Sequence, residues 1–426
     1  MKWIVRPSRL SGSIVIPPSK SHTIRALLVS ALANGESVVR RPLIKGDGES
    51  AIKAAVSLGA SVEIKGEDVY VKGVGGDFNR GSDFFDMGNS GTGLNLFCSA
   101  AALGSKKRRF DGDASLRSRP IKPLINALKE LGADITVESN TQDLPFVING
   151  PLKGGKVCVD GISSQFVSSL LFSAPLAEHD THITVYNIHE QPYIGITLWW
   201  LDKQCIELEY SQDLTSYKIR GSQTYRPFDM SVPSDFSSAA FSAVSGAIGS
   251  LPVELVGLDF SDPQGDKKIF DVLTSMGAQV THYDNAVKIC GGNLHGAIID
   301  LNSMPDALPA LSVAAACAEG ETVFTNVAQA RIKETDRIAV MVKELTKMGI
   351  EARELPDGMA VQGGRLKGAN VNGHNDHRIV MALAIAGMNA EGETIIDTAE
   401  SAQVTYPSFA EDFGSLGANI IVQSCD

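Results

Sequence analysis

The sequence has few aromatic residues, few cysteines and no long apolar run. Phe, Trp and Tyr make up 6% of the 426 residues, whereas apolar residues as a whole make up 43%, which is typical of a globular protein with an interior of small aliphatic side chains. No run approaches the roughly 18 apolar residues of a membrane span, and the start, MKWIVRPSRLSG, lacks the apolar core and cleavage site of a secretory signal. We therefore expect a cytoplasmic protein that does not enter a membrane.

The few cysteines are scattered, and no two of them form a CxxC pair. This distribution favours reduced, buried thiols over a disulfide framework or a zinc site. His374 and His377 are three residues apart, but no third ligand is near them in the sequence, so we predict no bound metal. The cysteines are Cys98, Cys158, Cys205, Cys290, Cys317 and Cys425.

Basic residues are outnumbered by acidic ones. Lys and Arg number 38 against 49 Asp and Glu, which gives a formal net charge of −11. A net anion does not attract nucleic acid or an anionic membrane, so we expect neither as a partner. Any anionic ligand must be bound by a local group of cations. The length corresponds to roughly two to three domains.

An internal repeat recurs about every 70 residues. Each copy has a small or polar start followed by an apolar, Ala-rich run without a polar face, which predicts a buried helix. The six copies begin at Ser19, Asn89, Ser163, Ser234, Pro305 and Asn375.

A second marker has the same period. A Leu-Gly or Met-Gly pair closes an amphipathic helix in five copies, and in the third copy, near Gln204, the glycine is missing. Each repeat is therefore predicted to contain an Ala-rich helix, a strand region, an amphipathic helix and two short strands. The marker glycines are Gly59, Gly132, Gly277, Gly349 and Gly417.

The repeats also predict the domains. The last copy, residues 375–426, is shorter than one period by about the length of residues 1–18, which carry the strand pattern GSIVIPP. We therefore expect the amino terminus to complete the carboxy-terminal repeat. Residues 19–233 would form one domain with repeats one to three. Residues 1–18 and 234–426 would form the other with repeats four to six, and the active site would lie in a cleft between the two.

Polar residues gather at the starts of the predicted buried helices. The first turn of a helix has unpaired N–H groups and the positive end of the helix dipole, so it attracts anions. Arg25 lies inside an apolar run, where a charge is costly unless it is paired or faces a ligand. For Asn89–Thr92 and Ser163–Gln165 ordinary helix capping is an equal alternative, and for Asp306 it is a strong one. Asn375, Asp376, His377 and Arg378 open the sixth helix.

The segment Arg331–Arg337, RIKETDR, lies away from the helix starts and has five charges in seven residues. One interpretation is a solvated helix with an ion pair between Glu334 and Arg337. The other is that Glu334 transfers protons, with a pKa set by the neighbouring cations.

Nine motifs resemble those of one enzyme family over nearly the whole chain. They are PPSKSHTIRALL, GNSGTG, LRSRPIKPL, VDGISSQF, QPYIGIT, PDALPAL, RIKETDR, NDHR and TYPSF. The family is that of the 5-enolpyruvylshikimate-3-phosphate (EPSP) synthases, or 3-phosphoshikimate 1-carboxyvinyltransferases. The resemblance implies an α/β (α+β) protein, a two-domain inside-out α/β barrel of six βαβαββ units, which acts as a monomer without a cofactor.

The resemblance also implies a reaction and site residues. The enolpyruvyl group of phosphoenolpyruvate would pass to the 5-hydroxyl of shikimate 3-phosphate through a tetrahedral intermediate, releasing phosphate, in the shikimate pathway to chorismate and the aromatic amino acids. Asp306 and Glu334 would transfer protons, and Lys20 would neutralise developing charge. Shikimate 3-phosphate would contact Lys20, Ser21, Arg25, Ser163, Ser164, Gln165, Tyr193, Asp306 and Lys333. Phosphoenolpyruvate would contact Lys20, Asn89, Gly91, Thr92, Arg119, Gln165, Arg337, His377 and Arg378.

Four positions depart from the family pattern: Asn95, Glu190, Gln329 and Val404. Glu190 replaces a serine expected near the shikimate phosphate, where a carboxylate would repel the ligand. Two other functions remain open from the sequence. One is the related enolpyruvyl transfer to a nucleotide sugar, although Lys20-Ser21 stands where that enzyme has Lys-Asn. The other is a non-catalytic repeat scaffold.

Overall fold

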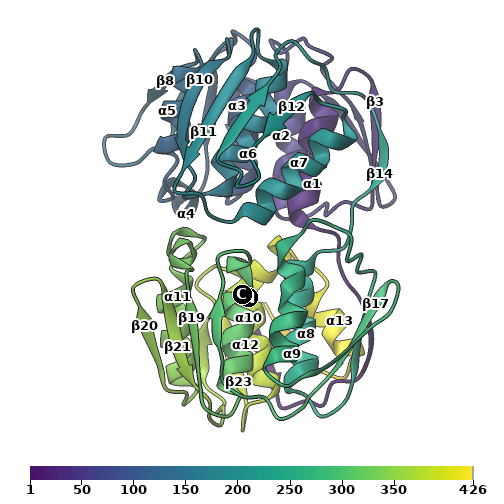
Figure 1. Cartoon of the computed structure of the whole chain (residues 1–426). Helices are drawn as coiled ribbons and strands as arrows, with labels where there is room; N and C mark the ends of the chain where they lie inside the picture. Colours follow the sequence, from purple (N-terminus) through teal and green to yellow (C-terminus); the bar gives the residue numbers. More distant parts are fainter. Residues whose placement is uncertain (425–426) are drawn as a thin grey trace. The chain divides into compact units, whose positions relative to one another are not determined.

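A computed structural model describes residues 1–424 of the chain. The chain divides into two compact units. The first, Pro18–Val232, is called here the continuous unit and runs from purple to teal in Figure 1. The second, Met1–Pro17 with Pro233–Asp426, is called the discontinuous unit. These boundaries lie one residue from those expected from the repeat.

The continuous unit contains three four-stranded sheets, in the orders β14-β3-β5-β4, β6-β7-β9-β8 and β10-β11-β13-β12. Its strands are β3 (Glu36–Arg40), β4 (Ser61–Lys65), β5 (Asp68–Lys72), β6 (Phe84–Asp86), β7 (Arg108–Asp111), β8 (Asp134–Val137), β9 (Phe146–Asn149), β10 (Gly155–Asp160), β11 (Thr181–Tyr186), β12 (Leu208–Tyr210), β13 (Ser216–Ile219) and β14 (Asp229–Ser231). Its helices are α1 (Lys20–Leu32), α2 (Asp47–Leu58), α3 (Gly91–Ala101), α4 (Ala114–Arg117), α5 (Lys122–Glu130), α6 (Ser164–Ser173), η1 (Ala174–Leu176) and α7 (Gln191–Lys203).

The discontinuous unit has the same plan, with sheets in the orders β16-β17-β15-β2, β18-β19-β21-β20 and β22-β23-β1-β24. Its strands are β1 (Lys2–Arg6), β2 (Gly12–Val15), β15 (Val253–Val256), β16 (Gln279–His282), β17 (Ala286–Cys290), β18 (Ile298–Asp300), β19 (Glu321–Thr325), β20 (Ala352–Leu355), β21 (Gly358–Gln362), β22 (Asn370–Asn372), β23 (Thr394–Asp397) and β24 (Asn419–Gln423). Its helices are α8 (Phe236–Ile248), η2 (Gly265–Lys268), α9 (Ile269–Ser275), η3 (Pro305–Ala307), α10 (Leu308–Ala316), η4 (Ala328–Ile332), α11 (Arg337–Lys347), α12 (His377–Met388), η5 (Ala399–Val404) and α13 (Phe409–Ser415).

Strand direction is the same in all six sheets. Each sheet has one parallel pair, and its other pairs are antiparallel. In four sheets the parallel strands are joined through a buried helix, as β6 and β7 are through α3, whereas β14 with β3 and β15 with β2 are strands far apart in the sequence. A parallel pair needs such a crossover, whereas antiparallel neighbours need only a short turn. The sequence therefore folds as βαβαββ units with the period that the Ala-rich helices predicted.

The amino-terminal segment contributes one strand to each of two sheets of the discontinuous unit. β1 pairs with β23 and β24, so that Trp3 lies opposite Ile396 on one side and Val422 on the other. The sequence pattern GSIVIPP, now β2, does not join this last sheet. It pairs instead with β15, with Ile14 opposite Leu255. The expectation that the amino terminus completes the last repeat is confirmed, but the strand that does so is β1 and not the GSIVIPP pattern.

The five marker glycines have positive φ angles between 83° and 114°. Glycine tolerates this conformation because it has no Cβ atom, and it ends a helix with little strain. In the third repeat, Cys205 occupies the corresponding place with a φ of 54° after the helix α7. The degenerate copy therefore keeps the turn and accepts a strained residue.

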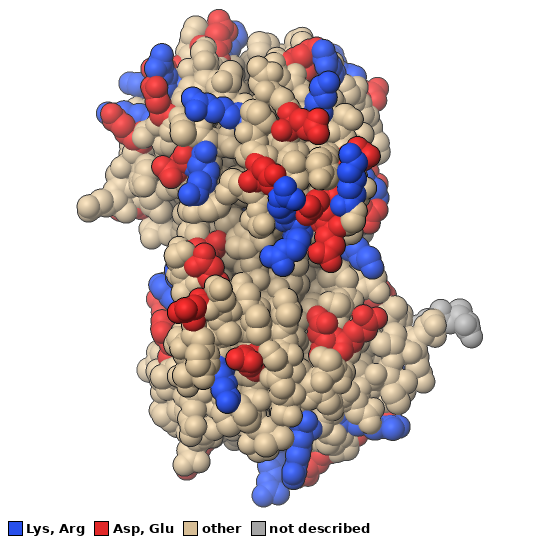
Figure 2. All heavy atoms as spheres, turned by 90° about the vertical axis from the view of Figure 1, so that its right-hand side faces the viewer, with Lys and Arg blue, Asp and Glu red and all other residues tan. Residues whose placement is uncertain are grey.

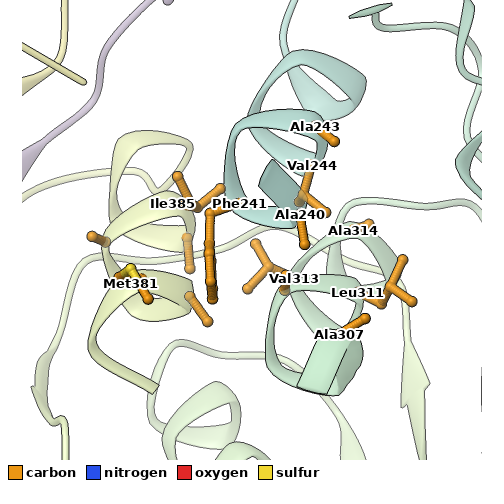
Figure 3. Packing of buried hydrophobic residues seen from close by; sticks show 14 of the residues in the cluster. Ala240, Phe241, Ala243, Val244, Ala307, Leu311, Val313, Ala314, Met381 and Ile385 are labelled. Atoms are coloured by element: carbon orange, nitrogen blue, oxygen red, sulfur yellow. The ribbon is translucent and has the colours of Figure 1, made fainter. Parts of the chain in front are cut away.

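The Ala-rich helices form the core of each unit. Phe241 of α8 lies between Val313 of α10 and Met381 and Ile385 of α12, and all four side chains are buried (Figure 3). In the continuous unit α1, α3 and α6 are buried in the same way. Each unit thus has a hydrophobic core of its own.

The cysteines are not uniformly buried. Cys98 is buried and burial raises its pKa to about 12, but Cys158 and Cys205 are exposed, so the expectation of buried thiols was wrong for these two. Cys290 and Cys317 are partly buried and, like the others, free, whereas Cys425 lies outside the described residues.

The described surface is of mixed charge. Figure 2 shows Lys and Arg interspersed with Asp and Glu over the face that it draws. Within residues 1–424, no helix has both the length and the apolar character of a membrane span.

Candidate active site

The discontinuous unit contains a cluster of three carboxylates around one arginine. Arg337, the first residue of α11, donates from Nη1 to Asp306 Oδ1 at 2.7 Å and from Nη2 to Glu334 Oε2 at 2.6 Å. Its Nε donates to Asp376 Oδ2 at 2.8 Å. Arg378 Nη2 lies 2.9 Å from Asp306 Oδ2. We call these five residues the acid–arginine cluster.

Attraction to the three carboxylates allows the charged side chain of Arg337 to be buried. The Arg337 side chain is 1% exposed. Burial lowers the pKa of Arg337, but the attraction of Asp376, Glu334 and Asp306 outweighs it and holds the pKa well above the usual value. The arginine is therefore a fixed cation.

The three carboxylates differ in exposure. The side chains of Asp306 and Glu334 are 15% and 13% exposed, whereas that of Asp376 is fully buried. Two of the three can therefore reach a ligand. The third acts within the protein, because its side chain also accepts from Arg378 N at the start of α12.

Local structure explains how each residue is placed. Asp306 lies in η3, just before α10, and Glu334 lies between η4 and α11. Lys333 directly follows η4, and His377 is the buried first residue of α12. The ion pair between Glu334 and Arg337 that the spacing predicted is present. The two residues do not share a helix, because Glu334 lies in the irregular segment before α11 and Arg337 is the first residue of α11.

In the continuous unit, Arg25 connects three helices. It is 1% exposed and donates from Nε to Thr197 Oγ1 at 3.0 Å, and from its other nitrogens to Ser21 O, Ser168 Oγ and Tyr193 O. Burial lowers its pKa to about 10. The buried charge is thus paired with acceptors from α1, α6 and α7, which the sequence left as one of two alternatives. The neighbouring Lys20 Nζ lies 3.3 Å from Asp47 Oδ2.

A second group surrounds the start of α3. Arg119 Nη2 donates to Asn89 Oδ1 at 2.5 Å, and a Cβ atom on Gly91 would lie 2.9 Å from Arg119 Nη1 and 3.9 Å from Gln165 Oε1. Asn95 Nδ2 donates to Gln165 Oε1 at 2.7 Å. Asn89, Gly91, Arg119 and Gln165 are therefore neighbours, and Thr92 lies in the same first turn.

A third group lies at the start of α6. Ser163 caps the helix by accepting from Gln165 N. Ser164 Oγ donates to Glu190 Oε2 at 2.9 Å, and Glu190 is 1% exposed with a φ of 53°. The carboxylate at the departure position therefore lies against a serine that was expected to bind phosphate. Tyr193 follows in the first turn of α7.

The comparisons with known proteins identify the family of the chain. A family model described as EPSP synthase (3-phosphoshikimate 1-carboxyvinyltransferase) matches residues 4–413. The chain belongs to this family. The 3-phosphoshikimate 1-carboxyvinyltransferases of Ruminiclostridium cellulolyticum and Acetivibrio thermocellus are each 47% identical to it over 416 residues, covering 98% of both chains.

Solved structures give the same result for the fold. An EPSP synthase structure from Acinetobacter baumannii aligns with a TM-score of 0.84 at 28% identity, covering 99% of this chain and 100% of the other. The chain therefore has the inside-out α/β fold of the EPSP synthase family, and the fold class expected from the sequence is confirmed.

Two further positions that depart from the family pattern lie in 3-10 segments. Gln329 in η4 is 4% exposed, and neither its Oε1 nor its Nε2 has a hydrogen-bond partner among residues 1–424. Val404 ends η5.

His374, one of the two histidines spaced three residues apart, contacts a carboxylate: its Nε2 lies 2.9 Å from Glu344 Oε1. Residues 1–424 contain no group of three or more His, Cys, Asp or Glu arranged for a metal ion.

Sequence reasoning missed Asp376 as a member of the cluster. It was noted only as part of a helix start, although a carboxylate before His-Arg is also the expected helix cap. The signal was present but could not be distinguished from capping, and in the structure Asp376 does both.

Proposed function

We propose that this protein transfers the enolpyruvyl group of phosphoenolpyruvate to the 5-hydroxyl of shikimate 3-phosphate, giving 5-enolpyruvylshikimate 3-phosphate and phosphate. Family membership over residues 4–413 supports the reaction. The observation that carries the mechanism is the pair of partly exposed carboxylates, Asp306 and Glu334, on one buried arginine.

The reaction needs two separate proton transfers. The hydroxyl loses a proton as it attacks the central carbon of phosphoenolpyruvate, and the methylene carbon gains one. Elimination of phosphate then removes a proton from the methyl group. Asp306 and Glu334 supply two such groups: the ionised one accepts the hydroxyl proton, and the protonated one donates a proton to the methylene carbon. Arg337 bonds to both carboxyl groups and fixes their positions.

The substrates are anions, and each unit supplies groups that can bind them. In the continuous unit these are Lys20, Ser21, Arg25, the Asn89–Thr92 turn, Arg119, Ser163, Ser164, Gln165 and Tyr193. In the discontinuous unit they are Lys333, Arg337, His377 and Arg378. Arginine and backbone N–H groups at helix starts suit carboxylate and phosphate oxygens. We propose that these groups bind both substrates and that bound substrate is shielded from water.

Arg337 has a further requirement in this mechanism. Its Nε, Nη1 and Nη2 all donate to protein carboxylates. A guanidinium has five N–H donors, so direct contact with phosphoenolpyruvate uses an N–H that these carboxylates leave or exchanges one of these bonds for a bond to the substrate. We further propose a monomer in the cytoplasm that needs no cofactor.

The experiment that tests the function is phosphate release from phosphoenolpyruvate. We expect release with shikimate 3-phosphate and none with a nucleotide sugar, and calorimetry should detect binding of shikimate 3-phosphate alone. Release only with the nucleotide sugar would assign the related transferase activity. Absence of heat with either small anion would favour a scaffold.

The carboxylates are tested by Glu334→Gln and Asp306→Asn. Each variant keeps the shape of the side chain but cannot act as a base, so turnover should fall on the order of 10²-fold or more. Near-normal turnover in both variants would show that the protons are transferred by other groups.

A further inference from the structure

The turn that precedes α12 has an unusual backbone. His374 and Asn375 are consecutive non-glycine residues with φ angles of 51° and 55°. This conformation is uncommon for residues other than glycine, and it persists only where the surroundings determine it. The turn therefore needs specific contacts that hold it.

Two main-chain N–H groups of the turn bond to the segment 397–398, Gly373 N to Asp397 O and Asn375 N to Thr398 Oγ1. Glu344 supplies the contacts from α11. Its side chain is fully buried, with Oε1 2.9 Å from His374 Nε2 and Oε2 accepting from Asn372 N at 3.1 Å. The turn adds a bond of its own from His374 N to Asn372 Oδ1 at 2.6 Å. Lys347 Nζ also binds the carboxylate at 2.7 and 2.9 Å, but it does not belong to the turn.

The same turn leads directly into the acid–arginine cluster. Asp376 follows Asn375, caps α12 and accepts from Arg337 Nε. Arg337 and Glu344 are seven residues apart on α11, which places them about two turns apart on one helix. α11 therefore contacts the segment 372–376 at two points. Arg337 bonds to Asp376 at the end of the segment, and Glu344 contacts Asn372 N and His374 Nε2 nearer its start.

We infer that Glu344 and His374 are positioning residues for the active site. They set the backbone of the turn, so that Asp376 meets Arg337 and Arg378 meets Asp306. The orientation of Asp306 and Glu334 depends on those two arginines. This inference rests on the proposed function for its kinetic consequence, but its structural part is independent of that function.

The chemistry of the contact supports a positioning role over simple stabilisation. A buried ion pair is weak evidence for stability, because apolar residues of similar volume often stabilise a fold as well or better. A carboxylate that accepts from one main-chain N–H and contacts one imidazole fixes a direction, which an apolar residue cannot do.

The test uses His374→Gly in the full-length protein. Glycine adopts the left-handed conformation without strain, so the variant removes the imidazole and not the turn geometry as such. Lys347→Met is the matched control, because it removes another partner of Glu344 that lies outside the turn. Hydrogen exchange in residues 373–380 should become at least tenfold faster in His374→Gly and remain unchanged in Lys347→Met.

The kinetic part of the test is a split between kcat and KM. A misplacement of about 1 Å lowers turnover by up to 10²-fold, so kcat of His374→Gly should fall 10- to 100-fold. The KM for shikimate 3-phosphate should change less than threefold. Added imidazole should restore part of kcat, since the His374 side chain is 24% exposed and the site is open to a small solute.

The outcomes separate the two proposals. Unchanged hydrogen exchange in His374→Gly would overturn the positioning role, whatever the activity. Faster exchange with wild-type kcat would show that the turn does not set the reacting groups, which also overturns it. If the wild-type protein has no turnover, the proposed function fails, and the exchange experiment still decides whether Glu344 and His374 hold the turn.

Discussion

At the scale of single residues, Glu190 raises the sharpest question about substrate binding. Its Oε2 accepts from Ser164 Oγ, the hydroxyl proposed to bind the phosphate of shikimate 3-phosphate. A carboxylate and a phosphate repel each other at this distance, and the hydroxyl cannot donate to both. Binding of the substrate therefore requires Ser164 to exchange its partner.

We expect Glu190→Gln to lower the KM for shikimate 3-phosphate by about three- to tenfold, because the repulsion is removed and the side-chain volume is kept. Steady-state kinetics of both substrates measure the change. The KM for phosphoenolpyruvate serves as the internal control and should stay within twofold. A higher KM for shikimate 3-phosphate would mean that Glu190 assists binding.

Asn95 controls the orientation of Gln165. Its Nδ2 donates to Gln165 Oε1, and its Oδ1 is buried without a partner among residues 1–424. This leaves the N–H groups of Gln165 available to an anion beside Arg119. An aspartate at position 95 cannot donate to Gln165 Oε1, so we expect the Gln165 amide to rotate by about 180° and donate to the aspartate. Its carbonyl oxygen would then face the anion, and the KM for phosphoenolpyruvate should rise about tenfold in Asn95→Asp.

A double-mutant cycle tests this orientation effect. In a Gln165→Ala background, Asn95→Asp should change the KM for phosphoenolpyruvate by less than threefold. An equal effect in both backgrounds would assign the change to the added charge alone.

At the scale of elements, the buried helices were predictable and several strand pairings were not. The Ala-rich runs have no polar face, so burial follows from composition alone. β1 has its partners in β23 and β24, almost 400 residues away in the sequence, and local patterns carry no information on such pairing. The bonds of Arg337 to Asp306 and Asp376 could not be predicted for the same reason, because these residues are 31 and 39 positions away in the sequence.

The helix α11 should make stability depend on pH. Burial raises the pKa of Glu344, but its bonds with His374 and Lys347 outweigh this and lower the pKa below the usual value of 4.5. The unfolded state therefore binds a proton before the folded state does. This contribution to stability is present above about pH 4.5 and is lost as the pH falls through the lower, folded pKa.

We expect Glu344→Gln to lower the free energy of unfolding by about 1 to 2 kcal/mol at pH 7, because it weakens hydrogen bonds of a charged group whose partners Lys347 and His374 are partly exposed. The difference from wild type should shrink below pH 4.5. Urea unfolding at a series of pH values measures it, with Lys53→Met as a control at an exposed ion pair. A difference that is constant with pH would show that the loss comes from packing.

At the scale of the whole molecule, the two units differ in how the chain builds them. The core of the continuous unit comes entirely from residues between 24 and 232. The core of the discontinuous unit needs Trp3, Val5, Leu10, Ile14 and Ile16 together with residues after 235. The net charge of −11 is compatible with anionic substrates, because a local group of cations can bind an anion in a protein of net negative charge.

This difference predicts how fragments of the chain behave. Residues 18–232 alone should fold and unfold cooperatively, because every strand of their three sheets and the whole core are present. Residues 233–426 alone should not, because the sheet β22-β23-β1-β24 loses an inner strand and β15 loses its neighbour β2. Circular dichroism during urea unfolding distinguishes the two fragments.

The control joins residues 1–17 to the carboxyl end of the second fragment through a flexible linker. β1 already pairs antiparallel with β24, so a linker from the end of the chain can return the strand to its place. We expect this permuted fragment to regain a cooperative transition. If residues 233–426 fold equally well without it, β1 and β2 contribute little to the core, and the sixth repeat would be stable without the strand that the amino terminus supplies.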